Sequence, residues 1–303
     1  MIYTITLNPS IDYVVELDGF EESTINRASK TNYYPGGKGI NVSRVLKRLG
    51  ADTMALGYAA GFTGNYIKEK LIEEQVAVRL LEVEGHSRIN VKLKADKETE
   101  INGTGPLVDE DAVKRLLHQL NELSSEDIVV LAGSIPGTVP SDIYETLIQK
   151  CQQHEAKIVL DTGGQTLKSL IPYKPFFIKP NHHELGDLFD VTIQSHADVI
   201  HYAGKIHNQG IENVVVSMAG EGAILYTESG VYFAKAPHGE VKNSVGAGDS
   251  LVAGFLAGYV NSRNSEEALR YGIASGSATA FSHDLCQKTD VYSLINLVEI
   301  EKL

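Results

Sequence analysis

The stretch from Asn243 to Gly258, NSVGAGDSLVAGFLAG, places three small residues before a carboxylate and then a helical run of apolar residues. The spacing predicts a helix that begins at Ala247 or Gly248, with Asp249 in its first turn. The first N–H groups of a helix lack intrahelical partners and form an anion site. Beside them, Asp249 can take a proton from an attacking hydroxyl. The stretch fits phosphoryl transfer, although a plain helix cap explains it too.

The composition limits the possible partners. The chain has 303 residues, 43% of them hydrophobic, and a net charge of −12. This size suits one large α/β domain or two smaller ones. The acidic balance argues against non-specific binding of nucleic acid or anionic membranes. Positions 23–51 differ, because they hold six basic residues and no acidic one. We therefore expect a small anionic ligand near this segment.

Cysteine usage and the N-terminus predict a cytoplasmic protein. Cys151 and Cys286 lack the spacing of a zinc site or a disulfide framework. The N-terminal sequence lacks the basic region and apolar run of a signal peptide. No uncharged apolar run approaches the length needed to span a membrane.

Short apolar, β-branched runs alternate with amphipathic helical segments along most of the chain. Such runs are typical of parallel strands that helices cover on both faces. Two more polar β segments, 12–34 and 88–102, interrupt this rhythm, and we interpret them as one lid, with a strand over 27–34. The sequence thus predicts an α/β fold whose central sheet is mostly parallel. The core domain is expected to comprise residues 1–11, 35–87 and 103–303.

Three features near the lid segments predict substrate binding. The glycine-rich turn 35–39 opens a second helix, with Lys38 and Asn41 in its first turn, so it is a second candidate anion site. Asp12 lies beside a strand end, where a carboxylate suits sugar hydroxyls; a turn Asp is the alternative. Arg88 begins the second lid segment, where it can close over a phosphate or pair with a surface acid.

Polar residues also follow the predicted core strands, whose carboxyl ends line the crevice of an open α/β sheet. Asn181 and Glu184 stand three apart at a helix start, where they suit a hydrated Mg²⁺ or form a capping box. The helix over 265–283 is rich in small residues, which allow an adenine ring or a neighbouring helix to pack closely. The other strand-end residues are Ser134, Asp161, Lys179, Ser217, Gly220 and Gly222.

The motifs together resemble a known family. The P-loop, the third glycine of GxGxxG, and the HRD and DFG kinase motifs are absent. PGGKGINVSR and NSVGAGDSLVAGF resemble the two signatures of the ribokinase-like (PfkB) family of carbohydrate kinases, and KPNHHE resembles its Mg-ATP motif. MIYTITLNPSIDY, SRINVK and ETEINGTGP resemble the 1-phosphofructokinase branch. The resemblance runs nearly the whole length of the chain.

The resemblance implies a ribokinase-like fold and transfer of the ATP γ-phosphoryl to the 6-hydroxyl of fructose 1-phosphate. Asp249 would be the catalytic base, the backbone of Gly246, Ala247 and Gly248 the anion hole, and Asp161 and Glu184 the Mg²⁺ ligands. Substrate binding would fall to Asp12, Arg27, Gly37, Lys38, Asn41, Arg88 and Ser134. ATP binding would fall to Lys179, Asn181, Ser217, Gly220, Gly222, Ala274 and Ser277.

Several alternatives stay open. Charge alone does not tell which end of the sugar carries the phosphate, so kinases of tagatose 6-phosphate and fructose 6-phosphate are rivals. A nucleoside or uncharged-sugar kinase is another, and so is a catalytically inactive sugar-phosphate sensor. Residues 243–245, Asn-Ser-Val, replace the family's common Asp-Thr-Thr and leave a K⁺ site open, while 134–137, SIPG, partly matches SLPPG. Exposed lid strands predict a homodimer through the lid.

Overall fold

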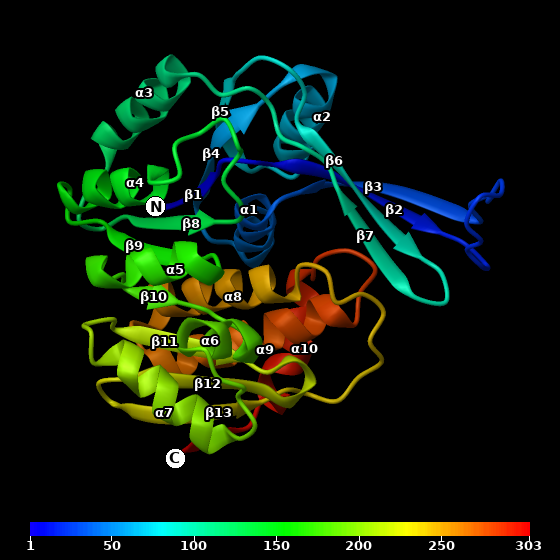
Figure 1. Cartoon of the computed structure of the whole chain (residues 1–303). Coiled ribbons are helices and arrows are strands. Elements are labelled where there is room, and N and C mark those ends of the chain that lie inside the picture. Colours follow the sequence, from blue (N-terminus) through cyan, green and yellow to red (C-terminus); the bar gives the residue numbers. More distant parts are fainter.

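A ten-stranded sheet runs through the computed structural model, which describes residues 1–303 (Figure 1). Its order is β14-β13-β12-β11-β10-β9-β8-β1-β4-β5. All neighbours from β11 to β5 are parallel, and β12 to β14 add an antiparallel end. The predicted, mostly parallel sheet is confirmed. The strands are β1 (Ile2–Thr6), β4 (Thr53–Ala59), β5 (Ala77–Glu82), β8 (Ile128–Ala132), β9 (Lys157–Asp161), β10 (Phe177–Ile178), β11 (Asn213–Ser217), β12 (Gly222–Thr227), β13 (Gly230–Lys235) and β14 (Ile300–Lys302).

Helices cover both faces of this sheet, as the apolar strand sequences predict. The helices are α1 (Lys38–Leu49), α2 (Gly61–Glu73), α3 (Glu110–Gln119), α4 (Ile143–Gln152), α5 (Gly164–Leu170), α6 (His182–Phe189), α7 (His196–His207), α8 (Ala247–Ser262), α9 (Ser265–Ala280) and α10 (Lys288–Leu294). Single 3₁₀ turns lie at Leu120–Glu122, Ile171–Tyr173, Ala219–Glu221 and Ile295–Leu297.

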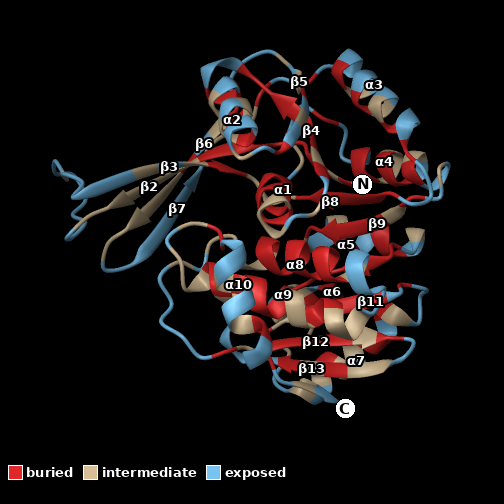
Figure 2. Ribbon diagram, turned by 180° about the vertical axis from the view of Figure 1, so that it is seen from behind, coloured by how far each residue is buried: buried red, intermediate tan, exposed pale blue.

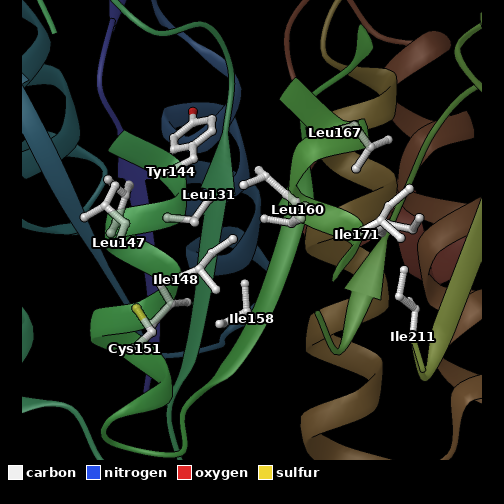
Figure 3. Close-up of a cluster of buried hydrophobic side chains, with 14 of the residues drawn as sticks. Leu131, Tyr144, Leu147, Ile148, Cys151, Ile158, Leu160, Leu167, Ile171 and Ile211 are labelled. Carbon is white, nitrogen blue, oxygen red and sulfur yellow. The ribbon is translucent and has the colours of Figure 1, made fainter. Parts of the chain in front are cut away.

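The side chains of successive residues in each central strand point to opposite faces of the sheet. In β8, Val129 and Leu131 join a cluster with α3 to α7, whereas Val130 joins a second cluster with α1, α8, α9 and α10. Figure 3 shows Leu131 in the first cluster, next to Tyr144 and Ile148 of α4. Each fully buried aliphatic side chain contributes about 1.5–3 kcal/mol, so these two layers hold the core together.

A separate four-stranded sheet, the lid, projects from one side of the core (Figure 1). Its order is β3-β2-β6-β7, in which only β2 and β6 run parallel. Figure 2 shows that the core is mostly buried and the outer part of the lid mostly exposed. The strands are β2 (Ser10–Glu16), β3 (Lys30–Gly36), β6 (Arg88–Lys94) and β7 (Glu98–Asn102).

The lid strands differ in their limits from the prediction. β2 begins at Ser10, two residues before the expected boundary, and β3 begins at Lys30 rather than at 27. The residues between them form a loop in which the Asn26 side chain accepts from Glu21 N and donates to Glu21 O. These side-chain bonds compete with strand pairing, so β3 begins later in the chain than predicted.

Hydrogen bonds that involve two lid strands join the lid to the core. Lys94 Nζ of β6 donates to Asn243 Oδ1 at 3.3 Å, and Tyr66 of α2 donates to the backbone oxygen of Tyr33 in β3 at 2.9 Å. The inner face of the lid therefore lies over the segment that precedes α8. None of the helices combines the length and apolar composition that crossing a membrane requires.

Candidate active site

Helix α8 begins where the sequence predicts, at Ala247, directly after Gly246. Gly246 adopts a left-handed conformation with φ of 79°, and a side chain there would start 2.6 Å from Leu285 Cδ2. Both facts require glycine. Asp249 lies in the first turn and is 6% exposed, so its carboxylate stands beside the free N–H groups of the helix.

A second helix start meets the first at the same place. Helix α1 begins at Lys38, and its N-cap Gly37 has φ of 103°. Asn41, in the first turn of α1, donates from Nδ2 to Asp249 Oδ2 at 2.8 Å. This bond fixes the Asp249 carboxylate between two helix N-termini, where both dipoles favour negative charge.

Burial is the main influence on the ionisation of Asp249. Desolvation, followed by the negative charge of Asp161, raises the pKa of Asp249 to about 6. Lys38, the hydrogen bond from Asn41 and Lys179 act in the opposite direction. A carboxylate with this pKa is ionised at neutral pH and is a stronger base than an exposed one.

Asp161, at the end of β9, holds two lysines beside Asp249. Its Oδ1 lies 3.0 Å from Lys38 Nζ and 3.5 Å from Lys179 Nζ, and the residue is 1% exposed. Burial raises the pKa of Asp161, but Lys179 and Lys38 outweigh it and hold that pKa below its usual value. Asp161 in turn raises the pKa of Lys38. Lys179 Nζ also lies 3.3 Å from where a Gly248 side chain would begin, so positive charge adjoins the start of α8.

A cavity of about 610 Å³ lies between the lid and the core, and it is lined almost entirely by polar residues. Asp249 and Gly246 lie in its wall, and so does most of the predicted substrate set. Those predicted residues are Asp12, Gly37, Lys38, Asn41, Arg88 and Ser134.

The lid presents one cation to this cavity that has no acidic partner. Arg88 forms no salt bridge, and its Nε donates to the backbone oxygen of Asn8 at 3.1 Å. By contrast, Lys92 and Lys94 of the same strand lie 2.6 Å from Glu100 and 3.9 Å from Glu98. Burial lowers the pKa of Arg88, with Asp12 acting in the opposite direction. Arg88 is therefore a partly desolvated cation available to an anion.

A second cavity of about 280 Å³ adjoins the first, and Ser244 lines both. Ala247 and Gly248, which are predicted to form the anion hole, are part of its wall. Half of its lining is hydrophobic, including Ile273 and Phe281, which suits a flat base. Four of the residues predicted to bind ATP line this cavity: Ser217, Gly220, Gly222 and Ser277.

Two of the predicted site residues lie elsewhere. Arg27 is exposed in the loop between β2 and β3 and lines neither cavity. The 17–29 loop carries it beyond the strands that face the cavity. Ala274 is fully buried in the apolar core, because α9 turns positions 273, 276, 277 and 280 toward the second cavity instead. Neither residue lines a cavity in this chain, and their contacts with ligands stay a prediction.

The predicted metal-binding pair lies near the site in a different arrangement. Asn181 and Glu184 form a capping box at the start of α6, with bonds of 2.8 and 2.9 Å, and line neither cavity. No cluster of three acidic, histidine or cysteine side chains forms a ready metal site. Asp161 Oδ2 is buried and accepts no hydrogen bond from the protein, which leaves one carboxylate oxygen for a cation. The Mg²⁺ roles of Asp161 and Glu184 stay a prediction.

The structure adds cavity residues that the sequence analysis missed, among them Asn8, Asn90, Lys92 and Glu100. Strand periodicity holds part of the signal, because Asn90 and Lys92 share the inward face of β6 with Arg88. Asn8 carries a weaker signal, since it lies just past β1 at the carboxyl edge of the sheet.

A buried carboxylate lies at the N-terminus of a helix, in the wall of a polar cavity that adjoins a half-apolar one. This arrangement is the one that a phosphotransferase requires. The model of the pfkB family of carbohydrate kinases matches residues 5–290, and the chain belongs to this family. The predicted family and ribokinase-like fold are confirmed.

Individual relatives are similar over the whole chain. The 1-phosphofructokinase of Bacillus subtilis (strain 168) is 51% identical over the full length of both proteins. The 1-phosphofructokinase of Borreliella burgdorferi is 36% identical across all of this chain and 99% of the relative. Phosphofructokinase-2 from Escherichia coli, solved in complex with substrates and products, superposes with a TM-score of 0.94 at 29% identity, covering 98% of each chain.

Proposed function

We propose that this carbohydrate kinase transfers the γ-phosphoryl group of ATP to the 6-hydroxyl of fructose 1-phosphate, giving fructose 1,6-bisphosphate and ADP. The environment of Arg88 is the observation that supports a phosphorylated substrate. A partly buried guanidinium without an acidic partner, in a polar cavity opposite the catalytic base, suits a substrate phosphate. The full-length similarity to two 1-phosphofructokinases supports the choice of sugar.

In this reaction Asp249 takes the proton of the 6-hydroxyl as that oxygen attacks the γ-phosphorus in line. The N–H groups at the start of α8 stabilise the charge on the transferred group, assisted by Lys38 and Lys179. Because Asn41 orients the Asp249 carboxylate, the base is in position before the substrate binds.

The second cavity would hold the nucleotide. Ser217, Gly220, Gly222 and Ser277 would contact ATP there, and Gly248 joins this cavity to the Asp249 site. Asp161 and Glu184, directly or through water, would hold Mg²⁺, which neutralises phosphate charge when it is bound. The unpartnered Asp161 Oδ2 supports this assignment. Lys179 and Asn181 would support the phosphates from the loop before α6.

The lid would close over the sugar and exclude water, because ATP hydrolysis is the competing reaction. Asp12 would then bind sugar hydroxyls. Its Oδ1 already accepts from Ser10 and Asn90, at 2.8 and 3.1 Å, which leaves Oδ2 for the substrate.

We also propose a homodimer formed through the outer face of the lid. The strand register aligns Tyr33, Tyr13, Val91 and Ile101 in one row across all four strands. Tyr13 and Tyr33 stack with ring centroids 4.5 Å apart, and Tyr33 and Ile101 are 54% and 61% exposed. Such an exposed apolar row favours burial against a second copy. Sedimentation should show a dimer that Ile101→Asp converts to monomer.

Two further expectations stay predictions. A cytoplasmic location is supported by Cys151 and Cys286, which are both free and buried. Dependence on a monovalent cation is tested by replacing K⁺ with tetramethylammonium in the assay.

The proposed reaction is tested by ADP release with fructose 1-phosphate, fructose 6-phosphate, tagatose 6-phosphate and fructose at equal low concentration. We expect clear preference for fructose 1-phosphate. Preference for a 6-phosphate would keep the mechanism and overturn the substrate assignment. Preference for fructose would remove the role of Arg88, and no turnover with any sugar would favour a binding sensor.

A further inference from the structure

Asn8 presents a buried acceptor that nothing in the protein satisfies. It follows β1, lines the substrate cavity and is 8% exposed. Its Oδ1 accepts no hydrogen bond from the protein. Buried amide oxygens almost always have a partner, because an unpaired one is costly. This oxygen therefore calls for a donor from outside the chain.

Two other polar atoms of Asn8 form hydrogen bonds with residues of the substrate cavity. Its backbone oxygen accepts from Arg88 Nε at 3.1 Å, and its Nδ2 donates to Ser134 Oγ at 3.5 Å. A side chain at Gly105 would start 2.3 Å from Asn8 Oδ1, so only glycine leaves room for the amide. Asn8 is thus held in one orientation, next to the phosphate-binding arginine.

Asn90 and Asp12 supply further acceptors on the same cavity. Asn90 is 5% exposed and donates from Nδ2 to Asp12, while its Oδ1 also lacks a protein partner. A wall of free acceptors matches a ligand that carries several hydroxyl donors. Of these acceptors, Asn8 is the one attached directly to Arg88 through its backbone.

We propose that Asn8 is a further substrate-binding residue, whose Oδ1 accepts a hydrogen bond from the C2 hydroxyl of fructose 1-phosphate. This inference rests on the proposed function. In the furanose form, C2 carries both a hydroxyl and the phosphorylated CH₂ group, so its hydroxyl is the one nearest the phosphate. A phosphate on Arg88 brings that hydroxyl beside Asn8.

The test combines Asn8→Ala with a substrate that lacks the hydroxyl. 2,5-Anhydro-D-mannitol 1-phosphate has the same ring and phosphate, with hydrogen in place of the C2 hydroxyl. For the native enzyme we expect kcat/KM to be about tenfold to a hundredfold higher with fructose 1-phosphate than with this analogue. Asn8→Ala should lose that factor with fructose 1-phosphate and change little with the analogue.

Two variants serve as controls. Asn121→Ala, at an exposed position outside the cavity, should leave both substrates unaffected. Asn8→Asp keeps an acceptor oxygen, so it should preserve the ratio between the two substrates even if its charge weakens both. The thermal midpoint and the KM for ATP show whether Asn8→Ala is folded. If it is not, Asn8→Asp still tests the inference.

Equal losses of Asn8→Ala with the two substrates would overturn the inference and leave Asn8 a positioning residue for Arg88. Failure of the native enzyme to discriminate between the two substrates would also overturn it. If the native enzyme does not phosphorylate fructose 1-phosphate at all, the proposed function itself fails.

Discussion

The core and the lid both line the substrate cavity, but they supply its functional groups in different physical environments. The core supplies Asp249 from a helix start buried between apolar layers, fixed by Asn41. The lid supplies Arg88 and Asp12 from a sheet that lacks a helical layer, with polar residues inward and an exposed apolar row outward. Burial raises the pKa of Asp249 in the core. The absence of an acidic partner leaves the Arg88 guanidinium of the lid available to an anion.

This difference separates the two kinds of residue by their kinetic effects. Groups that act on the reacting atoms belong to the rigid core, and a change there should lower kcat. The lid adds Arg88 and Asp12, which would bind the rest of the sugar phosphate, and a change there should raise KM. Each prediction below tests one side of this division.

Asp249→Asn should have the largest effect. The amide keeps the shape and the bond partner Asn41 but cannot accept the proton of the substrate hydroxyl. We expect kcat to fall by about 10³-fold, with KM values nearly unchanged. Steady-state kinetics with the purified variant measure this, and unchanged kcat would remove Asp249 as the base.

The second-largest effect should be a difference in stability between the core and the lid. Phe177→Ala empties a site in β10 that is fully buried against Phe255, with ring centroids 4.6 Å apart, and should cost about 3–5 kcal/mol of unfolding free energy. Glu98→Ala in the lid removes only an exposed 3.9 Å pair and should cost under about 0.5 kcal/mol. Urea denaturation measures both. Equal losses would contradict the contrast between a packed core and a thin lid.

Arg88→Ala should act on binding. Loss of one charge-assisted contact costs about 1.5–3 kcal/mol, so kcat/KM for fructose 1-phosphate should fall by about one to two decades. Most of the loss should appear in KM. Fructose, which has no phosphate, should be affected far less, and this comparison within one variant is the control. An equal loss with both sugars would mean that Arg88 only supports the lid.

The pH dependence should give the smallest effect. Asp249 must be ionised to act, and its pKa is raised to about 6, so kcat/KM should fall about tenfold per pH unit below that value. The bond from Asn41 lowers this pKa, so Asn41→Ala should move the acid limb to higher pH. A limb that does not move would reflect ionisation of the substrate phosphate instead.

Local signals explain what the sequence predicts well. The start of α8, its glycine N-cap and Asp249 occupy adjacent positions, and the alternation of apolar runs with helices determines a mostly parallel sheet. These features depend on residues that are close together in the chain, so the motif and the periodicity are sufficient to predict them.

The features that the sequence does not predict depend on tertiary contacts. The face of α9 that meets the second cavity is set by packing against α8, and this packing places Ala274 in the apolar core. The loop between β2 and β3 takes Arg27 away from the cavity. Asn8 and Asn90 matter because they are buried without partners, and no pattern of residue types records that property.

The most direct test of the central claim is to follow the transferred phosphoryl group by ³¹P NMR, with ATP, Mg²⁺ and fructose 1-phosphate in the same tube. We predict that the native enzyme builds up fructose 1,6-bisphosphate and ADP in equal amounts, while Asp249→Asn produces neither at a comparable rate. Release of inorganic phosphate without a sugar bisphosphate, or a bisphosphate formed equally well by Asp249→Asn, would contradict the account.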